Sequence, residues 1–466
     1  MNYTSDRVRN SSADFPDLLV IPNPFKKFVN NGTSIEKTPT GVEIVCFHGD
    51  VYYDEDDYTC ERCGSRMHVH DVYKCTLRHV CLGEKPSVVM FDKHRFECPV
   101  CGHMHMQRVL FKAENHRITN ELLAQVENLL ARGYNNKQVA ELTNLGQGTV
   151  KEIDKERLKR LYTENGKLKR PSKTTKYIAI DEFKLHDGNK YATHIIDLEN
   201  GHVIWIQEGK KKQVVYDFME FVGEEWMKHV IGVACDMNSD FEEAFKERCP
   251  HIKPVFDRFH IVKNFNEKVI SEIRKDEQQR LIDEGDEEAA RHLKHSKYIL
   301  MSNRSTLKRK DAEALNGKVI HEGSSIFGTH SVTRKGGYQE KYEQLISENK
   351  LLFTADLVKE MLSDAYECTS SIRMAEILDK IIETCQAALN KHFNWFADLL
   401  VRHYDGIVAH ADIPISSGKI EGLNNKIKTV RRNAYGIPDD EYFFLKVIDA
   451  SNKEYVRNPK THKISH

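Results

Sequence analysis

The sequence predicts a multidomain α/β protein in which a mixed sheet, interrupted by a long helical insertion, follows two smaller domains. Three observations support this class. The chain of 466 residues is too long for one ordinary hydrophobic core. Six of its 11 cysteines lie between Cys60 and Cys101, which indicates a separate metal-binding segment. The hydrophobic pattern also changes from a helical to a β period near Lys176.

The composition favours a globular protein without a membrane partner. Charged residues make up 30% of the chain, the hydrophobic set makes up 40%, and the formal net charge is −1. No run approaches the roughly 18 apolar residues that span a bilayer, and the N-terminal residues lack a signal-peptide pattern. We therefore expect a cytoplasmic location. The balanced net charge argues neither for nor against nucleic acid as a partner.

Two cysteine pairs predict a zinc ribbon over residues 46–112, with short strands at 88–91 and 95–97, after a loosely ordered arm at residues 1–45. The pairs lie in Cys60-Glu61-Arg62-Cys63-Gly64 and Cys98-Pro99-Val100-Cys101-Gly102. Each pair can give two thiolates to one structural Zn²⁺, and four cysteines leave no coordination position open for catalysis. Reduced free cysteines or a redox pair are the alternative. Side chains that could replace one ligand are Cys75, Cys81, His68, His70, His103 and His105.

Residues 113–165 have helical periodicity and predict a helix-turn-helix. We expect a first helix that ends at Gly133, a short second helix capped by Asn136, and a longer third helix over 149–161. This arrangement is typical of DNA-binding proteins, although a three-helix bundle without DNA is the alternative. The residues near the start of the recognition helix that would contact DNA are Gln147, Thr149 and Lys151.

A basic linker at residues 166–175 follows the predicted helix-turn-helix. From Lys151 to Lys176 there are ten Lys or Arg residues and four acidic ones, and Lys169 and Arg170 stand directly before Pro171. Such a linker can neutralise phosphates along a DNA duplex and also indicates a domain boundary.

Residues 176–263 predict the first part of a catalytic domain. Strands are expected at 177–183, 191–197 and 202–206, then a helix at 213–227, a strand at 230–235, a helix at 240–248 and a strand at 251–256. The order βββαβαβ is that of a mixed sheet with a crossover helix. Residues 264–412 are mostly helical in composition, with one candidate strand pair at 319–331, and form the insertion. Residues 413–455 complete the domain before a polar tail at 456–466.

Three acidic residues are placed to form a metal site. Asp181 and Asp236 close the first and fourth strands, and Glu421 stands on a helix after the insertion. In a ribonuclease H-like sheet these positions converge at one edge, where open α/β sheets bind ligands. Carboxylates suit Mg²⁺ or Mn²⁺, and two such ions can promote in-line displacement at a phosphodiester. Other acids that compete with this set or could join it are Glu182, Asp240 and Asp257.

The helix that carries Glu421 is predicted from about Lys419 to Arg432. One face is apolar, so it can pack on a core: Ile420, Leu423, Ile427 and Val430. An ordinary solvated amphipathic helix is the alternative. The polar side chains that would face DNA are Asn424, Asn425, Lys428 and Arg432.

Taken together, these motifs resemble the ISL-three family of bacterial insertion-sequence transposases. Besides the ribbon and the helix-turn-helix, the matching motifs are Ala179-Ile180-Asp181-Glu182, Cys235-Asp236-Met237, Asp257-Arg258-Phe259-His260 and the run from Gly418 to Lys428 that continues to Arg432-Asn433-Ala434-Tyr435-Gly436. The resemblance covers about residues 55–450 and is most specific in the last motif. It implies a DDE transposase that binds terminal inverted repeats, cleaves the transposon 3′ ends and joins them to target DNA. The implied triad is Asp181, Asp236 and Glu421.

The resemblance also implies partners and supporting residues. Double-stranded DNA, as transposon ends and as target, would be bound in a bacterial cytoplasm, and a homodimer or larger oligomer is expected because two ends must be brought together. Asp257, His260 and Ser417 would support the triad. The chain departs from the family at Ser417, where Asn usually precedes the Gly, and at residues 316–337, which look longer than is typical.

Two other functions remain open from the sequence. A DNA-binding regulator would use the ribbon and the helix-turn-helix and keep the sheet as an inactive scaffold, but the presence of all three acids disfavours it. A nuclease or resolvase without strand transfer would share the metal site, and only joined DNA products would separate it from a transposase.

Overall fold

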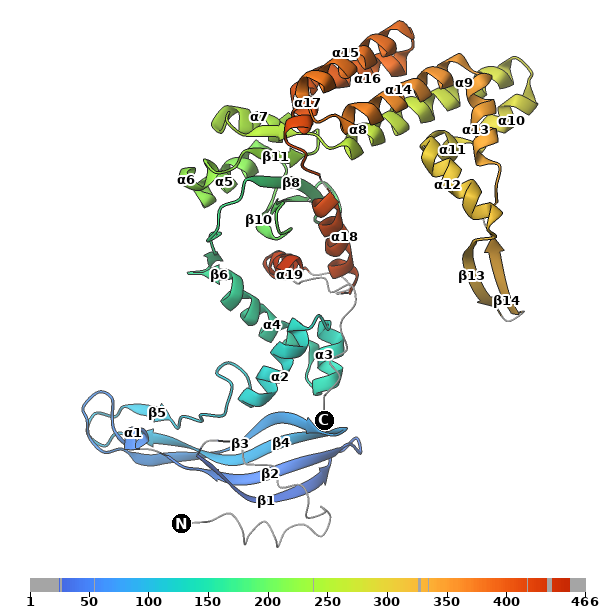
Figure 1. Ribbon diagram of the computed structural model, residues 1–466. Coiled ribbons are helices and arrows are strands. Elements are labelled where there is room, and N and C mark those ends of the chain that lie inside the picture. The colour runs from blue at the N-terminus through green and yellow to red at the C-terminus, as the bar shows by residue number, and fades with distance from the viewer. Residues whose placement is uncertain are drawn as a thin grey trace, which may run out of the picture. The chain divides into compact units, whose positions relative to one another are not determined.

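The computed structural model describes residue 25 and residues 27–53, 55–237, 239–325, 328–333, 335–416, 418–433 and 438–452 (Figure 1). Its contacts divide the chain into two units, which are described separately. One contains Met1–Leu168 and Val430–Lys446, and the other contains Lys169–Thr429 and Val447–His466. Among the described helices, none combines the length and apolar character needed to cross a membrane.

A five-stranded sheet forms the N-terminal part of the first unit. Its strands are β1 (Phe28–Lys37), β2 (Glu43–Val51), β3 (His68–Leu82), β4 (Lys85–Glu97) and β5 (Met104–Met106), and a short helix α1 (Glu55–Tyr58) follows β2. The strand order is β1-β2-β4-β3, with β5 also paired to β4. The two short strands expected at 88–91 and 95–97 belong to one continuous strand, because the polar residues between them keep pairing with β3.

Strand β1 corrects the expectation of a loosely ordered arm over residues 1–45. From Phe28 onward the segment pairs antiparallel with β2, and the register shifts between Asn30 and Gly32. This bulge and the polar run around it hide the two-residue period by which a strand is recognised. Residues 1–24 of the predicted arm, like the predicted tail from residue 453, lie outside the described residues.

The three helices expected after the sheet are present. They are α2 (Asn120–Ala131), α3 (Asn136–Thr143) and α4 (Gln147–Tyr162). Asn135 rather than Asn136 caps α3, and Asn144 ends that helix in a left-handed conformation with φ of 53°. The helices share a buried apolar core that includes Leu122, Val126, Val139, Val150 and Ile153. A two-strand hairpin, β6 (Thr163–Glu164) and β7 (Lys167–Leu168), follows α4.

The first turns of α19 (Asp440–Asn452) pack on α4 around a buried carboxylate. Asp154 is fully buried; it accepts hydrogen bonds from Tyr442 Oη at 2.7 Å and from Lys446 Nζ at 2.8 Å, and Arg157 Nη2 lies 2.9 Å from its other oxygen. Burial alone would raise the pKa of Asp154, but the charges of Lys446 and Arg157 outweigh it and hold the pKa below its usual range.

A mixed five-stranded sheet organises the second unit (Figure 1). Its strands are β8 (Tyr177–Lys184), β9 (Tyr191–Asp197), β10 (Val203–Glu208), β11 (Gly232–Cys235) and β12 (Lys253–Val255). The order is β10-β9-β8-β11-β12: β8, β9 and β10 form an antiparallel meander, and β11 is parallel to both β8 and β12. The predicted element order βββαβαβ and the mixed sheet are therefore confirmed.

The helices between these strands differ in one place from the prediction. A single helix was expected over 213–227, but the chain forms α5 (Lys212–Val222) and α6 (Glu224–Met227), followed after β11 by α7 (Ser239–Arg248). The break lies at Gly223, whose φ of 89° is outside the right-handed helical region.

The long insertion between β12 and α18 (Gly418–Asn433) is helical, as expected. It contains α8 (Arg258–Asn264), a π-helical segment (Phe265–Ile270), α9 (Ser271–Asp283), α10 (Glu287–Lys294), α11 (Lys297–Leu300), α12 (Arg304–Leu315), the hairpin β13 (Val319–Ser325) and β14 (Gly328–Thr333), α13 (Tyr338–Ser347), α14 (Lys350–Glu367), α15 (Ser371–Ala387), α16 (Lys391–Arg402) and α17 (Tyr404–Asp412). Helix α14 lies alongside α8 and α9 (Figure 1). The hairpin confirms the candidate strand pair.

The buried carboxylate on α4 gives a stability prediction. Replacing Asp154 by Ala leaves the charges of Lys446 and Arg157 without their buried partner, so we expect the free energy of unfolding to fall by about 3–5 kcal/mol. Because the pKa of Asp154 is lowered in the folded state, its contribution is present above the unfolded pKa near 3.8 and is lost as the pH falls through the folded value. Denaturant unfolding at a series of pH values measures both effects.

The matched control for this prediction is Glu152→Ala, an exposed acid on the same helix, which should change the stability by no more than about 0.5 kcal/mol. If Asp154→Ala keeps the acid dependence of the wild type, Asp154 is not the titrating group.

Candidate metal and nucleic-acid sites

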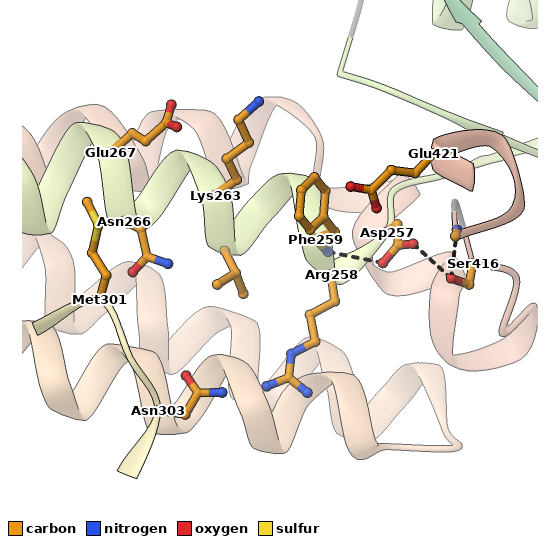
Figure 2. Close-up of a pocket in the computed structure, with 12 residues that line it drawn as sticks. Asp257, Arg258, Phe259, Lys263, Asn266, Glu267, Met301, Asn303, Ser416 and Glu421 are labelled. Atoms are coloured by element: carbon orange, nitrogen blue, oxygen red, sulfur yellow. Dashed lines mark hydrogen bonds between the residues drawn. The ribbon is translucent and has the colours of Figure 1, made fainter. Parts of the chain in front are cut away.

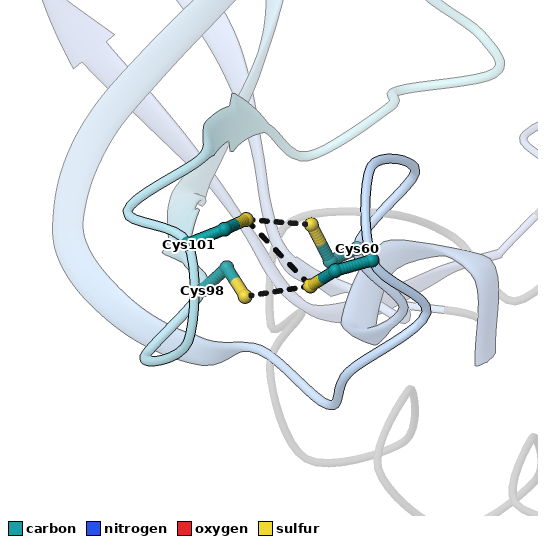
Figure 3. Close-up of side chains that lie close together, drawn as sticks. Cys60, Cys98 and Cys101 are labelled. Carbon is teal, nitrogen blue, oxygen red and sulfur yellow. Dashed lines mark hydrogen bonds between the residues drawn. The ribbon is translucent and has the colours of Figure 1, made fainter.

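Four cysteine thiols converge at one end of the N-terminal sheet (Figure 3). The Sγ atoms of Cys60 and Cys101 lie 3.5 Å apart, as do those of Cys63 and Cys98, and all four lie within 4.8 Å of one another. Four ligands about 2.3 Å from one tetrahedral Zn²⁺ would be about 3.8 Å from each other, so the cluster has the dimensions of a zinc site. Among the described residues, no other group of three or more His, Cys, Asp or Glu side chains meets this distance criterion.

The two cysteine pairs lie on equivalent turns. The backbone N–H of Gly64 donates to the carbonyl of Cys60, and that of Gly102 donates to the carbonyl of Cys98, both at 2.9 Å. Both glycines have φ of 68°, a left-handed conformation that a side chain would strain. Hydrogen bonds from Ser65 lower the pKa of Cys63 to about 6, which favours its thiolate. The pKa of Cys101 is raised instead, because a backbone hydrogen bond from His103 is outweighed by burial and by hydrogen bonds with the other three thiols.

Two of the four histidines considered as substitute ligands have other partners. His70 pairs with Asp71 at 2.8 Å, and His105 Nε2 lies 3.0 Å from the carbonyl oxygen of Asp57. The four-cysteine set is therefore the metal-binding group that this segment offers.

A second group of polar side chains lies where the parallel pairing of β8 with β11 ends. Strand β11 stops there, whereas β8 continues past Asp181 to Lys184, so Asp181 does not close its strand as expected. These parallel strands pair with Ile180 opposite Cys235. Asp181 and Asp236 are the next residues of the two strands, so the backbone brings both to the same edge of the sheet.

Helix α18 contacts this edge through an amide. Asn424 Nδ2 donates to Asp181 Oδ2 at 2.6 Å, and the backbone N–H of Glu182 donates to Asp181 Oδ1 at 2.7 Å. Burial raises the pKa of Asp181, and the negative charge of Asp236 raises it further, whereas these two hydrogen bonds act in the opposite direction. Asn424 was expected to face DNA. Its contact with Asp181 could not be inferred from the sequence, because it forms only in the folded chain.

Asp236 has a histidine neighbour. His260 Nδ1 lies 3.3 Å from Asp236 Oδ1, and the Asp236 side chain is 53% exposed while that of His260 is 20% exposed. His260 comes from α8, the first helix after β12, and so connects the start of the insertion to the sheet edge.

Glu421 stands on α18 one turn before Asn424 and is exposed. It lines a cavity of about 610 Å³ together with Asp257 and Ser416 (Figure 2). Asp257 caps α8 by accepting from the N–H of Phe259 at 3.0 Å, and Ser416 Oγ donates to Asp257 at 3.2 Å. Ser417, which was expected to support the triad, lies outside the described residues, and its neighbour Ser416 makes this contact.

The three acids do not meet as a closed cluster, and Glu421 lines a cavity that Asp181 and Asp236 do not line. Asp181, Asp236 and Glu421 do not form a group within 4.8 Å, unlike the four cysteines. Three of the four residues predicted for the apolar face of α18 are buried, namely Ile420, Leu423 and Ile427, and Val430 is half-buried. The other residues expected on its polar face are exposed: Asn425, Lys428 and Arg432.

The residues expected to contact DNA around the helix-turn-helix and the linker differ in their exposure and in their partners. Gln147 on α4 is exposed, as are Lys169 and Arg170 of the basic linker in the second unit. Lys151 Nζ, however, lies 3.6 Å from Asp439, in the segment before α19. Sequence reasoning missed this acidic segment, which also pairs with two more lysines of α4.

Both of these lysines make short ion pairs with the segment. Lys155 Nζ lies 2.8 Å from Asp439 and 2.9 Å from Glu441, and Lys159 Nζ lies 2.8 Å from Glu441. The spacing of Lys151, Lys155 and Lys159 at every fourth residue was the signal in the sequence, since it places them on one face of the helix.

Comparisons with known proteins agree with the motifs. The family model DDE_Tnp_ISL3, described as "Transposase", matches residues 178–447. The chain is 29% identical over 389 residues to the transposase for insertion sequence element IS1001 of Bordetella parapertussis, which covers 83% of this chain and 87% of that protein. It is 24% identical over 277 residues to the transposase for insertion sequence element IS1557 of Mycobacterium tuberculosis, which covers 56% of each chain. The chain therefore belongs to the ISL3 family of insertion-sequence transposases.

Proposed function

We propose that this protein is an active DDE transposase that binds the terminal inverted repeats of its insertion sequence, cleaves the 3′ ends and transfers them into target DNA. The observation that carries the proposal is the hydrogen bond from Asn424 to Asp181. It ties the helix of Glu421 to the sheet edge where Asp181 and Asp236 lie side by side. The sheet order and this placement of acids support the proposal that residues 176–263 and 413–455 form a ribonuclease H-like catalytic domain.

The proposed catalytic residues are Asp181, Asp236 and Glu421. Asn424 acts as a positioning residue, because its hydrogen bond to one oxygen of Asp181 fixes the orientation of that carboxylate. Residues three apart lie on neighbouring turns of a helix face, so Glu421 projects from the same side of α18 as Asn424. His260 orients Asp236 in the same way from α8.

The donor set fits a hard divalent cation. Two carboxylates on adjacent strands, with the pKa of Asp181 raised by burial and by the charge of Asp236, form a site whose negative charges repel each other until a cation is bound. Asp181, Asp236 and Glu421 would hold Mg²⁺ or Mn²⁺. When bound, such ions activate an attacking oxygen and stabilise a leaving oxygen at phosphorus.

The remaining parts would recognise DNA. We propose that α2 to α4 act as the helix-turn-helix, that Gln147 and Thr149 face the duplex, and that Lys169, Arg170, Asn425, Lys428 and Arg432 contact phosphates. The four cysteines would hold a structural Zn²⁺ in the ribbon. Two transposon ends require at least a dimer on DNA, and the protein would act in the bacterial cytoplasm.

The catalytic assignment is tested with Glu421→Gln. We expect cleavage and strand transfer of DNA carrying the terminal repeats to be lost, because an amide is a poor ligand for the metal, while binding to the repeats survives. Gel assays of nicked and joined products in Mg²⁺ measure the first, and a mobility shift measures the second.

Glu383→Gln on α15 is the matched control, since Glu383 is an exposed helical glutamate of the insertion. Cleavage by Glu421→Gln at the wild-type rate would refute the triad. Cleavage without joined products in the wild type would instead make the protein a nuclease.

The zinc assignment is tested with the double variant Cys60→Ser, Cys98→Ser. We expect elemental analysis to find one zinc per wild-type chain and none in the variant, with a lower unfolding temperature for the variant because metal binding contributes folding energy. Cys368→Ser should keep the metal, since Cys368 lies outside the cluster. Full zinc occupancy in the double variant would exclude these ligands.

The acidic segment that contains Asp439 and Glu441 gives a prediction about DNA binding. The double variant Asp439→Asn, Glu441→Gln should free Lys151, Lys155 and Lys159 for phosphates, so DNA binding should tighten about three- to tenfold and the slope of log affinity against log salt should steepen by up to about 3. The control Glu287→Gln, Glu288→Gln changes the net charge equally at two exposed acids of α10 and should have little effect. Unchanged affinity in the first variant would show that this face of α4 does not contact DNA.

A further inference from the structure

Glu421 lines the cavity described above, whereas Asp181 and Asp236 do not. Its walls come from α8, the π-helical segment, the turn before α12 and the segment before α18, and Figure 2 shows Glu421 directed toward the ring of Phe259. A volume of about 610 Å³ is that of a site for a small organic group. Metal binding by carboxylates does not account for a space of this size.

An aromatic ring stands at the acidic end of this cavity. The Phe259 side chain is 46% exposed, although its neighbour Ile261 is fully buried. Asp257 fixes the start of the helix by accepting from the N–H of Phe259, and the ring of Phe259 packs edge-on against His260 with a centroid distance of 5.5 Å. An exposed, fixed ring is a surface on which a nucleic-acid base can stack.

Amide groups line the opposite end. Asn266 lies in the π-helical segment, and its Oδ1 is buried without a hydrogen-bond partner among the described residues. Asn303 stands at the N-cap position of α12, yet its side chain makes no capping hydrogen bond and lines the cavity instead. π-Helical segments often occur at functional sites, and amides can pair with the polar edge of a base.

The wall that carries Asn303 is held in place from behind. Lys359 Nζ is buried and donates to the carbonyls of Leu300 and Ser302, both at 2.9 Å. These bonds fix the backbone on either side of Met301, directly before Asn303.

The charges of the lining decide which part of a nucleotide fits. Arg258 and Lys263 are cationic, and Asp257, Glu267 and Glu421 are acidic. Arg258 also donates to Ser363 at 3.0 Å. Acids outnumber cations in the lining, so a neutral base suits the cavity better than a phosphate does.

We propose that this cavity receives one base of the bound DNA, unstacked from the duplex next to the phosphate that reacts. The base stacks on Phe259, and its polar edge meets Asn266 and Asn303. The inference rests on the proposed function of the same edge of the sheet. It adds that the enzyme opens the duplex there and selects the position of the reacting phosphate through an extrahelical base.

The first test uses fluorescence without cleavage. Duplexes that carry a terminal repeat and its flank, with 2-aminopurine placed at one position at a time around the cleavage point, are bound in the presence of EDTA. We expect one position to brighten about threefold or more on binding, as an unstacked base does, and Phe259→Ala to abolish the increase. Phe353→Ala, which removes an exposed ring of α14 outside the cavity, is the control and should keep it.

The second test asks whether the effect of Phe259 on cleavage depends on the unstacked base. On intact DNA, Phe259→Ala should slow cleavage in Mg²⁺ about tenfold to a hundredfold, because stacking no longer offsets the cost of unstacking. On DNA with an abasic site at the bright position, wild type and variant should cleave at equal rates. The inference is overturned if Phe259→Ala slows cleavage equally at every abasic position, or if no 2-aminopurine position brightens on binding. Either result leaves the catalytic triad intact. If the wild type cleaves no DNA, the proposed function fails and the fluorescence result alone decides the base site.

Discussion

The contact between Asn424 and Asp181 is the interaction on which the second unit depends. It joins a strand to a helix that follows it only after the whole insertion, yet the two groups are 2.6 Å apart. The entropy cost of closing a loop of that length is moderate, because it rises only with the logarithm of the length. The contact forms only if the chain, at the end of the insertion, returns to the part of the sheet where the insertion began.

Two close approaches make the insertion return there. Helix α17 packs on β12 at Gly406, where a Cβ atom would lie 2.3 Å from the ring of Phe256, and the Phe256 N–H donates to the Gly406 carbonyl at 3.1 Å. Gly232 of β11 lets Ile413 lie against that strand, since a Cβ atom there would be only 3.2 Å from the Ile413 side chain. The segment before α18 is thus held against the sheet edge, and the helices of the insertion can vary without moving Glu421.

This arrangement explains how far sequence reasoning could go. The periods of β9 and α18 and the spacing of the cysteine pairs are local, so these elements and the apolar face of α18 were predictable. The role of Asn424 was not, because an amide on a polar helix face gives no sign of its partner. Strand β1 and the break at Gly223 were missed for a different reason: a bulge and a single positive φ angle disrupt the period on which prediction depends.

The cysteine cluster shows how little core supports its end of the N-terminal sheet. The buried apolar group there consists of Cys60, Met67, Phe96 and Cys98, with two tyrosines packed against it. Most side chains in the first half of β3 are exposed, so this part of the ribbon buries little apolar surface of its own. A small core is usually supplemented by a cross-link, and four converging thiols can supply one by binding a metal. The metal would therefore hold the two turns together, and the sheet would depend on it most where its hydrophobic contacts are fewest.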